Sequence, residues 1–154
     1  MQIRRAGVED IPSLLELLEQ VLAKHAEIRP DLFIPHTTKY DKRELSLIVN
    51  NEETPVFVCE EERVIAYAFV VKEILPQSRN MYAQKNAYLD DLCVDEAYRG
   101  KGIAGKLLAY VEEEMRKEGI ASLTLNVWEG NEEAKSFYEK EGCRIRKTMM
   151  EKEL

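Results

Sequence analysis

A glycine-rich segment, Arg99-Gly100-Lys101-Gly102-Ile103-Ala104-Gly105, has the clearest chemical potential in this sequence. It follows the apolar run 92–94 and precedes apolar residues at helical spacing. Small residues at a helix N-terminus let backbone N–H groups face a ligand, and the helix dipole favours an anion. The Arg-x-x-Gly-x-Ala spacing therefore predicts a pyrophosphate-binding loop that needs no metal, although a plain strand-to-helix turn has the same pattern.

Two other glycine motifs fit this segment less well. Residues 100–106 match the P-loop pattern except at its last position, where Leu107 replaces the Ser or Thr that binds Mg²⁺. Residues 100–105 also spell GxGxxG, but residues 95–99 separate the strand from the first glycine. A dinucleotide fold needs a direct strand-to-glycine turn and several further βα units, which the rest of the chain is too short to supply.

Two signatures together resemble the GCN5-related N-acetyltransferase superfamily. The first is Val94-Asp95-Glu96-Ala97-Tyr98-Arg99 before the loop, and the second is Asn131-Glu132-Glu133-Ala134-Lys135-Ser136-Phe137-Tyr138. The resemblance implies an α+β fold with three α/β/α layers and a mixed, mostly antiparallel sheet. It also implies direct acetyl transfer from acetyl-CoA to a primary amine of a small molecule or a protein.

The resemblance also implies which residues contact acetyl-CoA. The loop amides would bind the pyrophosphate, and the preceding strand would pair with the pantetheine arm, with a backbone N–H at or near Leu92 facing the oxyanion. The implied contact residues are Leu92, Cys93, Val94, Arg99, Gly100, Lys101, Gly102, Ile103, Ala104, Gly105, Asn131 and Tyr138.

Asn131 and Tyr138 are seven residues apart, so two helical turns place them on one face. The resemblance implies that Tyr138 protonates the departing coenzyme A thiolate. An alternative remains open for both residues: Asn131 as a helix N-cap and Tyr138 as an ordinary core aromatic beside Phe137.

The general base is less clearly indicated. Asn126 occupies the position where some superfamily members carry a glutamate, and an amide does not accept a proton at neutral pH. Asp90 and Asp91 are the remaining candidates, and adjacent strand residues face opposite ways, so one is expected to reach the acceptor side. We expect Asp91 to be the catalytic residue; a role in attracting a cationic substrate, or a water as proton acceptor, stays open. Phe33 and Tyr40 are candidates for the acceptor wall.

Hydrophobic periodicity predicts the elements that position these residues. The expected order is a strand at 2–5, a helix from Ile11, a helix at 41–50, strands at 55–59, 64–74 and 87–94, a helix from Ile103 towards Gly119, a strand at 122–127, a helix at 131–141, and a closing strand pair from Cys143. The strands ending at Val94 and Val127 are expected to be parallel, joined through the helix after the loop.

Length, composition and charge limit the number of domains and the kinds of partner that we expect for this chain. The 154 residues, 45% apolar, predict a single domain over 1–154. A net charge of −7 argues against nucleic acid as a partner. Two histidines and three scattered cysteines predict no metal site. No signal peptide or eighteen-residue apolar run is seen, so a cytoplasmic location without membrane contact is expected. A homodimer stays open, as does a regulatory domain that binds coenzyme A without turnover.

Overall fold

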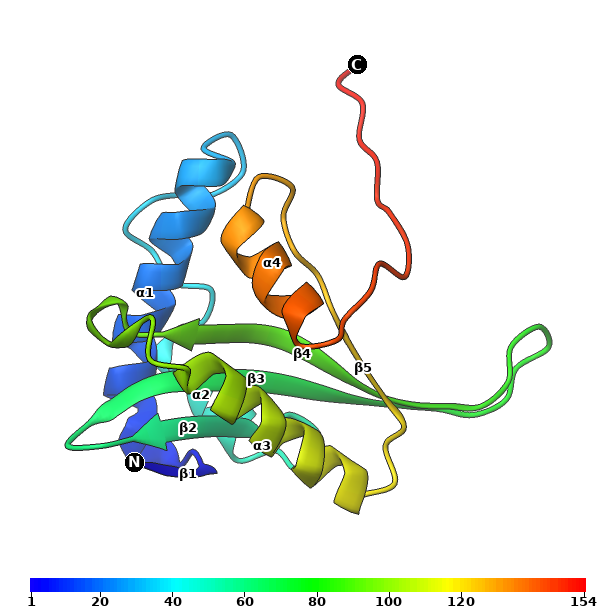
Figure 1. The fold of residues 1–154 in the computed structure, drawn as a ribbon, viewed down its shortest axis with the longest axis horizontal. Coiled ribbons are helices and arrows are strands. Elements are labelled where there is room, and N and C mark those ends of the chain that lie inside the picture. The colour runs from blue at the N-terminus through cyan, green and yellow to red at the C-terminus, as the bar shows by residue number, and fades with distance from the viewer.

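The computed structural model describes residues 1–154 (Figure 1). Its elements are β1 (Gln2–Arg5), η1 (Val8–Asp10), α1 (Ile11–Ile28), α2 (Lys42–Val49), β2 (Val56–Glu60), β3 (Val64–Leu75), β4 (Gln84–Val94), η2 (Glu96–Tyr98), α3 (Ile103–Lys117), β5 (Ser122–Leu125) and α4 (Glu132–Lys140). The order agrees with the sequence prediction up to α4.

One five-stranded sheet runs through the molecule in the order β1-β2-β3-β4-β5. The first three pairings are antiparallel, whereas β4 and β5 are parallel because α3 makes the crossover between them. The predicted mixed, mostly antiparallel sheet is therefore confirmed.

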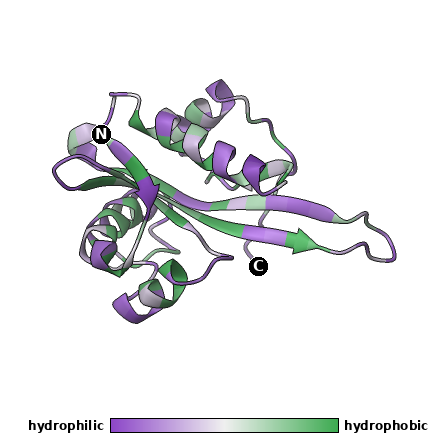
Figure 2. Ribbon diagram, turned by 90° about the horizontal axis from the view of Figure 1, so that it is seen from below, coloured by the Kyte–Doolittle hydropathy of each residue, from purple (hydrophilic) through white to green (hydrophobic).

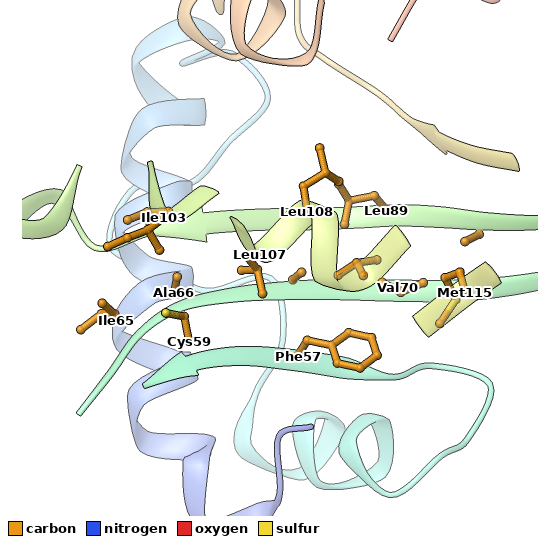
Figure 3. Packing of buried hydrophobic residues seen from close by; sticks show 14 of the residues in the cluster. Phe57, Cys59, Ile65, Ala66, Val70, Leu89, Ile103, Leu107, Leu108 and Met115 are labelled. Carbon is orange, nitrogen blue, oxygen red and sulfur yellow. The ribbon is translucent and has the colours of Figure 1, made fainter. Parts of the chain in front are cut away.

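Helices cover both faces of the sheet, as the edge-on view in Figure 2 shows. On one face, α3 contributes Ile103, Leu107, Leu108 and Val111 to a core that includes Val70 and Leu89 (Figure 3). On the other face, Leu14, Leu17 and Leu18 of α1 and Leu45 of α2 pack against strand residues such as Tyr67 and Phe69. The chain thus has the expected three α/β/α layers, driven by burial of one apolar stripe on each helix.

Local sequence signals mark where α2 begins and where α3 ends. The Asp41 carboxylate accepts from the Glu44 backbone N–H at 2.8 Å, and Glu44 bonds back to the Asp41 N–H, so a capping box begins α2. Gly119, with a φ of +76°, follows α3 where the sequence predicts its end. None of the helices combines the length and apolar character that a membrane span requires.

The predicted closing strand pair is wrong. Residues 143–154 form no strand or helix, and their side chains beyond Cys143 are exposed. Alternating residues such as Ile145 and Met149 give this tail strand character, but a strand forms only where a neighbouring strand supplies backbone partners. No strand of the same chain lies beside the tail, which runs away from the body in Figure 1.

Candidate active site

The candidate site begins where β4 and β5 separate. Their pairing runs from Asn86 opposite Ser122 to Leu89 opposite Leu125, and then β5 ends while β4 continues to Val94. Residues 90–94 therefore present a strand edge without a neighbour on the β5 side, and the two chain segments diverge in Figure 1. This edge includes the predicted pantetheine-binding residues Leu92, Cys93 and Val94, of which Cys93 and Val94 have buried side chains.

The glycine-rich loop lies at the end of this edge and leads into α3. Gly100 and Gly102 both have a φ of +77°, a conformation that glycine adopts without strain, and a Cβ added to either would meet no atom within 4 Å. The first backbone hydrogen bond of the helix runs from the Lys106 N–H to the Gly102 carbonyl at 3.2 Å. The amides of 100–105 donate to no backbone carbonyl, so they form a set of free donors at a helix N-terminus.

Three side chains hold this loop in place. Asp95 is buried; its carboxylate accepts from the Ala97 N–H at 2.9 Å and from the Arg63 guanidinium at 2.8 Å. Burial alone would raise the pKa of Asp95, but these two interactions bring it below its usual value. The Tyr98 ring contacts two cations, the Arg63 guanidinium and the Lys101 ammonium, which lie 5.5 and 5.1 Å from its centre. Arg63 could not be identified from the sequence, because its contact with Asp95 joins residues far apart in the chain.

The Arg99 side chain extends back towards the end of β4. Its Nε donates to the Val94 carbonyl at 3.2 Å, which ties the start of the loop to the end of the strand. The free amides, the two glycines in the left-handed region and the anchored loop fit a pyrophosphate group. They therefore fit the acetyl-CoA that the sequence predicts as cosubstrate.

A β-bulge in β4 changes the expected orientation of the two aspartates. Phe69 pairs with Asp91 and Val70 pairs with Leu89, so Asp90 is an extra residue without a partner in β3. Asp90 accepts from the Tyr40 hydroxyl at 2.8 Å and from the Lys39 ammonium at 2.9 Å. We expected the side chains of Asp90 and Asp91 to face opposite ways, and this expectation is wrong. The Asp90 carboxylate accepts from Tyr40 and the Asp91 carboxylate accepts from Tyr67, and these two tyrosines belong to one aromatic cluster.

That cluster consists of Tyr40, Tyr67 and Phe69, and its members touch through ring contacts of 5.8 and 4.8 Å. The fully buried Tyr67 donates its hydroxyl hydrogen to Asp91 at 2.7 Å. Burial raises the pKa of Asp91 to about 6, although the Tyr67 hydrogen bond and the charge of Lys39 lower it. Asp91 is thus a carboxylate that exchanges its proton near neutral pH. No short-range sequence pattern links Tyr67 to Asp91, so this partner could not be predicted.

Tyr138 lies on α4, and Asn131 immediately precedes this helix. Asn131 is the N-cap of the helix, and its side chain accepts from the Ala134 N–H at 3.2 Å. Tyr138 is half-buried, with its ring 5.0 Å from that of Phe137. Burial raises the pKa of the Tyr138 hydroxyl, and the charge of Asp91 raises it further, so the two groups influence each other electrostatically.

Comparison with known proteins agrees with this geometry. The family model described as "Acetyltransferase (GNAT) family" matches residues 18–143. The chain belongs to this family. Among curated relatives, the uncharacterized N-acetyltransferases YycN and YdgE of Bacillus subtilis (strain 168) are 36% identical over 73 residues and 35% identical over 74 residues. Each match covers 47% of the relative, so this chain aligns with about half of their length.

Solved structures extend the similarity to the whole chain. A tetramutant of the BH1408 protein from Bacillus halodurans is 31% identical, with a TM-score of 0.95 and 100% of both chains covered. An aminoglycoside acetyltransferase, meta-AAC0020 from an uncultured soil metagenomic sample, is 19% identical, with a TM-score of 0.73 over 99% of this chain and 95% of that one. The second similarity concerns the fold alone.

In this GNAT chain, a further aromatic group lies between the end of α1 and the segment after β5. Phe33 packs between His25 and Trp128, with ring centres 5.1 and 5.4 Å away. The Arg29 guanidinium lies 5.8 Å from the centre of the Trp128 ring. Phe33 and Tyr40, the two predicted wall residues, thus belong to separate aromatic groups, of which only that of Tyr40 contacts the aspartates.

Other polar groups near this GNAT site have structural partners. Asn126 donates its amide to the Tyr88 hydroxyl at 2.9 Å. Buried Asn86 bonds to Glu73, Ser122 and Thr124 and so joins β3, β4 and β5. No group of three or more His, Cys, Asp or Glu side chains is arranged to hold a metal ion.

Proposed function

We propose that the chain is an N-acetyltransferase that transfers the acetyl group of acetyl-CoA to a primary amine by direct attack. The observation that carries this proposal is the free edge of β4 at 90–94, which leads to the unpaired amides at the start of α3. A strand edge and a helix N-terminus in series offer a binding surface for a peptide-like arm followed by a pyrophosphate. The family of the chain supports the same conclusion.

The loop amides of 100–105 would bind the pyrophosphate, and Arg99 would keep the loop against β4. The backbone of Leu92, Cys93 and Val94 would pair with the pantetheine arm, with a backbone N–H at or near Leu92 facing the oxyanion. Asn131 would contact acetyl-CoA while its side chain caps α4. Acetyl-CoA supplies an activated thioester carbonyl, the acceptor supplies the amine, and the remaining groups in this scheme belong to the chain.

Two side chains would move protons during transfer. Asp91 would accept a proton from the cationic amine, because a carboxylate with a pKa of about 6 is ionised at neutral pH yet basic enough to act. The amine nitrogen then bonds to the acetyl carbon and the carbon–sulfur bond breaks. Tyr138 gives its hydroxyl proton to the thiolate, and the second proton that the nitrogen loses on becoming an amide restores the Tyr138 hydroxyl. The raised pKa of Tyr138 keeps that proton in place until it is needed.

We also infer a reducing compartment such as the cytoplasm. The three cysteines, Cys59, Cys93 and Cys143, are free thiols, and the first two are buried in the core. Unpaired buried thiols are typical of proteins that fold where disulfides do not form.

A thiol-release assay tests the proposal. The chain is incubated with acetyl-CoA and a panel of polyamines, aminoglycosides and peptides with free lysines or N-termini, and released coenzyme A is measured. Cys143 is partly accessible, so a reaction without acetyl-CoA provides the thiol blank. We expect turnover with at least one amine class. Binding of acetyl-CoA without release in the presence of any amine would instead favour a regulatory domain.

A further inference from the structure

Lys39 places a primary amine at the point where β4 and β5 separate. Its ammonium lies 2.9 Å from Asp90 Oδ1, and Asp90 is the first residue of β4 beyond the last pair of the two strands, Leu89 and Leu125. The Tyr40 hydroxyl donates to the other carboxylate oxygen at 2.8 Å. Two neighbouring side chains therefore hold the segment between α1 and α2 against the free edge of β4.

The Lys39 ammonium also lies close to the groups that would move protons in acetyl transfer. Burial raises the pKa of Asp91, the Tyr67 hydrogen bond lowers it, and the positive charge of Lys39 lowers it further. Burial raises the pKa of Tyr138, and the charge of Asp91 raises it further. Burial lowers the pKa of His25, and the charge of Lys39 again adds to this shift. The lysine amine thus lies between the aromatic group of His25 and the proposed proton-transfer residues.

The Lys39 side chain is free to leave its partner. It is 48% exposed, whereas the Asp90 side chain is only 13% exposed, so the lysine is the less constrained member of the pair. An ion pair open to water is weak, and a lysine ammonium on its flexible four-carbon stem turns readily to a neighbouring acceptor. Asp91 follows directly on the same strand. The amine therefore reaches the proposed base by a change of side-chain rotamer alone.

Other lysines with carboxylate partners lie elsewhere. Lys72 binds Glu118 at 2.7 Å, and Lys117 binds Glu114 at 2.7 Å. Lys117 is the last residue of α3, at the opposite end of this helix from the glycine-rich loop, and its side chain is 60% exposed. Exposure and an ion pair are therefore common to Lys39 and Lys117, and the position at the free edge of β4 distinguishes Lys39.

We propose that this chain acetylates its own Lys39 at the ε-nitrogen, a modification that rests on the acetyl transfer proposed above. One proton passes from the Lys39 ammonium to Asp91. The neutral nitrogen bonds to the acetyl carbon of acetyl-CoA, and the carbon–sulfur bond breaks. The thiolate takes the Tyr138 hydroxyl proton, and the second proton that the nitrogen loses restores this hydroxyl. The product is an uncharged N-acetyl-lysine, so the ion pair with Asp90 is lost.

Mass spectrometry of the full chain, incubated with acetyl-CoA and no added amine, tests self-acetylation. We expect a single acetyl group per chain, located on Lys39, and release of an equal amount of coenzyme A. Lys39 should react about 100-fold faster than Lys117, because an amine held beside the thioester reacts as an intramolecular partner. The rate per chain should not depend on the chain concentration, since the donor site and the lysine belong to one molecule.

Three variants locate the reaction. Lys39→Arg keeps a cation beside Asp90 but has no amine to acetylate, so labelling of the chain should fall to the slow background seen at Lys117. Asp91→Asn should slow acetylation of Lys39 by about 100-fold and leave that of Lys117 unchanged. Lys117→Arg is the matched control and should keep the full rate at Lys39.

The same reactions with the amine panel separate this proposal from the proposed function. Acetylated panel amines, together with a Lys39 that reacts no faster than Lys117, would overturn self-acetylation and leave the proposed function intact. Absence of both products would overturn both proposals. A rate at Lys39 that rises with chain concentration, or that is the same in Asp91→Asn and the wild type, would also overturn self-acetylation at this site.

Discussion

Replacing Asp91 with asparagine should lower activity and raise stability in the same variant. The half-buried Asp91 carboxylate has a pKa of about 6 against an ordinary value of 3.8, because loss of contact with water disfavours its ionised form in the folded chain. A shift of roughly two pKa units corresponds to at most about 3 kcal/mol of unfolding free energy at pH 7. Asparagine has nearly the same shape, carries no charge and still accepts the Tyr67 hydrogen bond.

The sign of the pH dependence follows from proton binding. Between about pH 4 and pH 6 the folded chain keeps a proton on Asp91 that the unfolded chain has released, so this carboxyl lowers stability as the pH rises through that window. Below about pH 4 the carboxyl is neutral in both states and resembles asparagine. The stability gain of Asp91→Asn should therefore be largest at pH 7 and vanish near pH 4.

Urea unfolding of the wild type and of Asp91→Asn at pH 7 and pH 4 measures this gain. The contributions of all other titrating groups cancel in the difference between the two unfolding free energies. Thiol release should fall by about 100-fold or more if Asp91 is the base. Asp90→Asn is the control, since that carboxylate is bound by Lys39 and Tyr40 and lies outside the proposed proton path. An equal stability difference at both pH values would refute the buried-charge argument, and unchanged turnover would refute the role as base.

Three further predictions concern the residues around Asp91 and the loop. Tyr138→Phe should lower kcat by about 100-fold in the thiol-release assay while the Kd for acetyl-CoA, measured by calorimetry, changes little; unchanged kcat would return Tyr138 to a packing role. Tyr67→Phe removes a hydrogen bond that lowers the pKa of Asp91, so the rise of kcat/KM with pH should move upwards from about 6, and an unmoved profile would exclude this coupling. Gly102→Ala should cost about 1–2 kcal/mol of stability and weaken acetyl-CoA binding, because alanine is strained at a φ of +77°. Gly119→Ala, with a φ of +76° beyond α3, should cost similar stability but leave the Kd unchanged, and equal Kd values in both variants would contradict the loop assignment.

Local patterns predicted much of this molecule. The apolar spacing of Leu107, Leu108 and Val111 identifies α3, and the small residues before it identify the loop, because both signals depend on neighbours in the sequence. Asn131 as an N-cap follows from the same short-range chemistry. The fold class and the parallel pairing of β4 with β5 could thus be predicted from the sequence.

Features that depend on long-range contacts could not be predicted in this way. The bulge at Asp90 is set by the register of β4 against β3, and alternation within β4 alone gives no sign of it. The Tyr67–Asp91 hydrogen bond joins two strands and depends on that register. The tail from Cys143 has strand periodicity, but its conformation depends on whether a neighbouring edge is available.

Detection of the acetylated product tests the central claim most directly. The chain is incubated with acetyl-CoA carrying an isotopically labelled acetyl group and with the best amine from the panel, and the product is analysed by mass spectrometry. We predict that the label appears on the amine nitrogen, at a rate that falls together in Asp91→Asn and Tyr138→Phe. Label that reaches no amine, or that reaches it equally fast in both variants and in the wild type, would contradict the account.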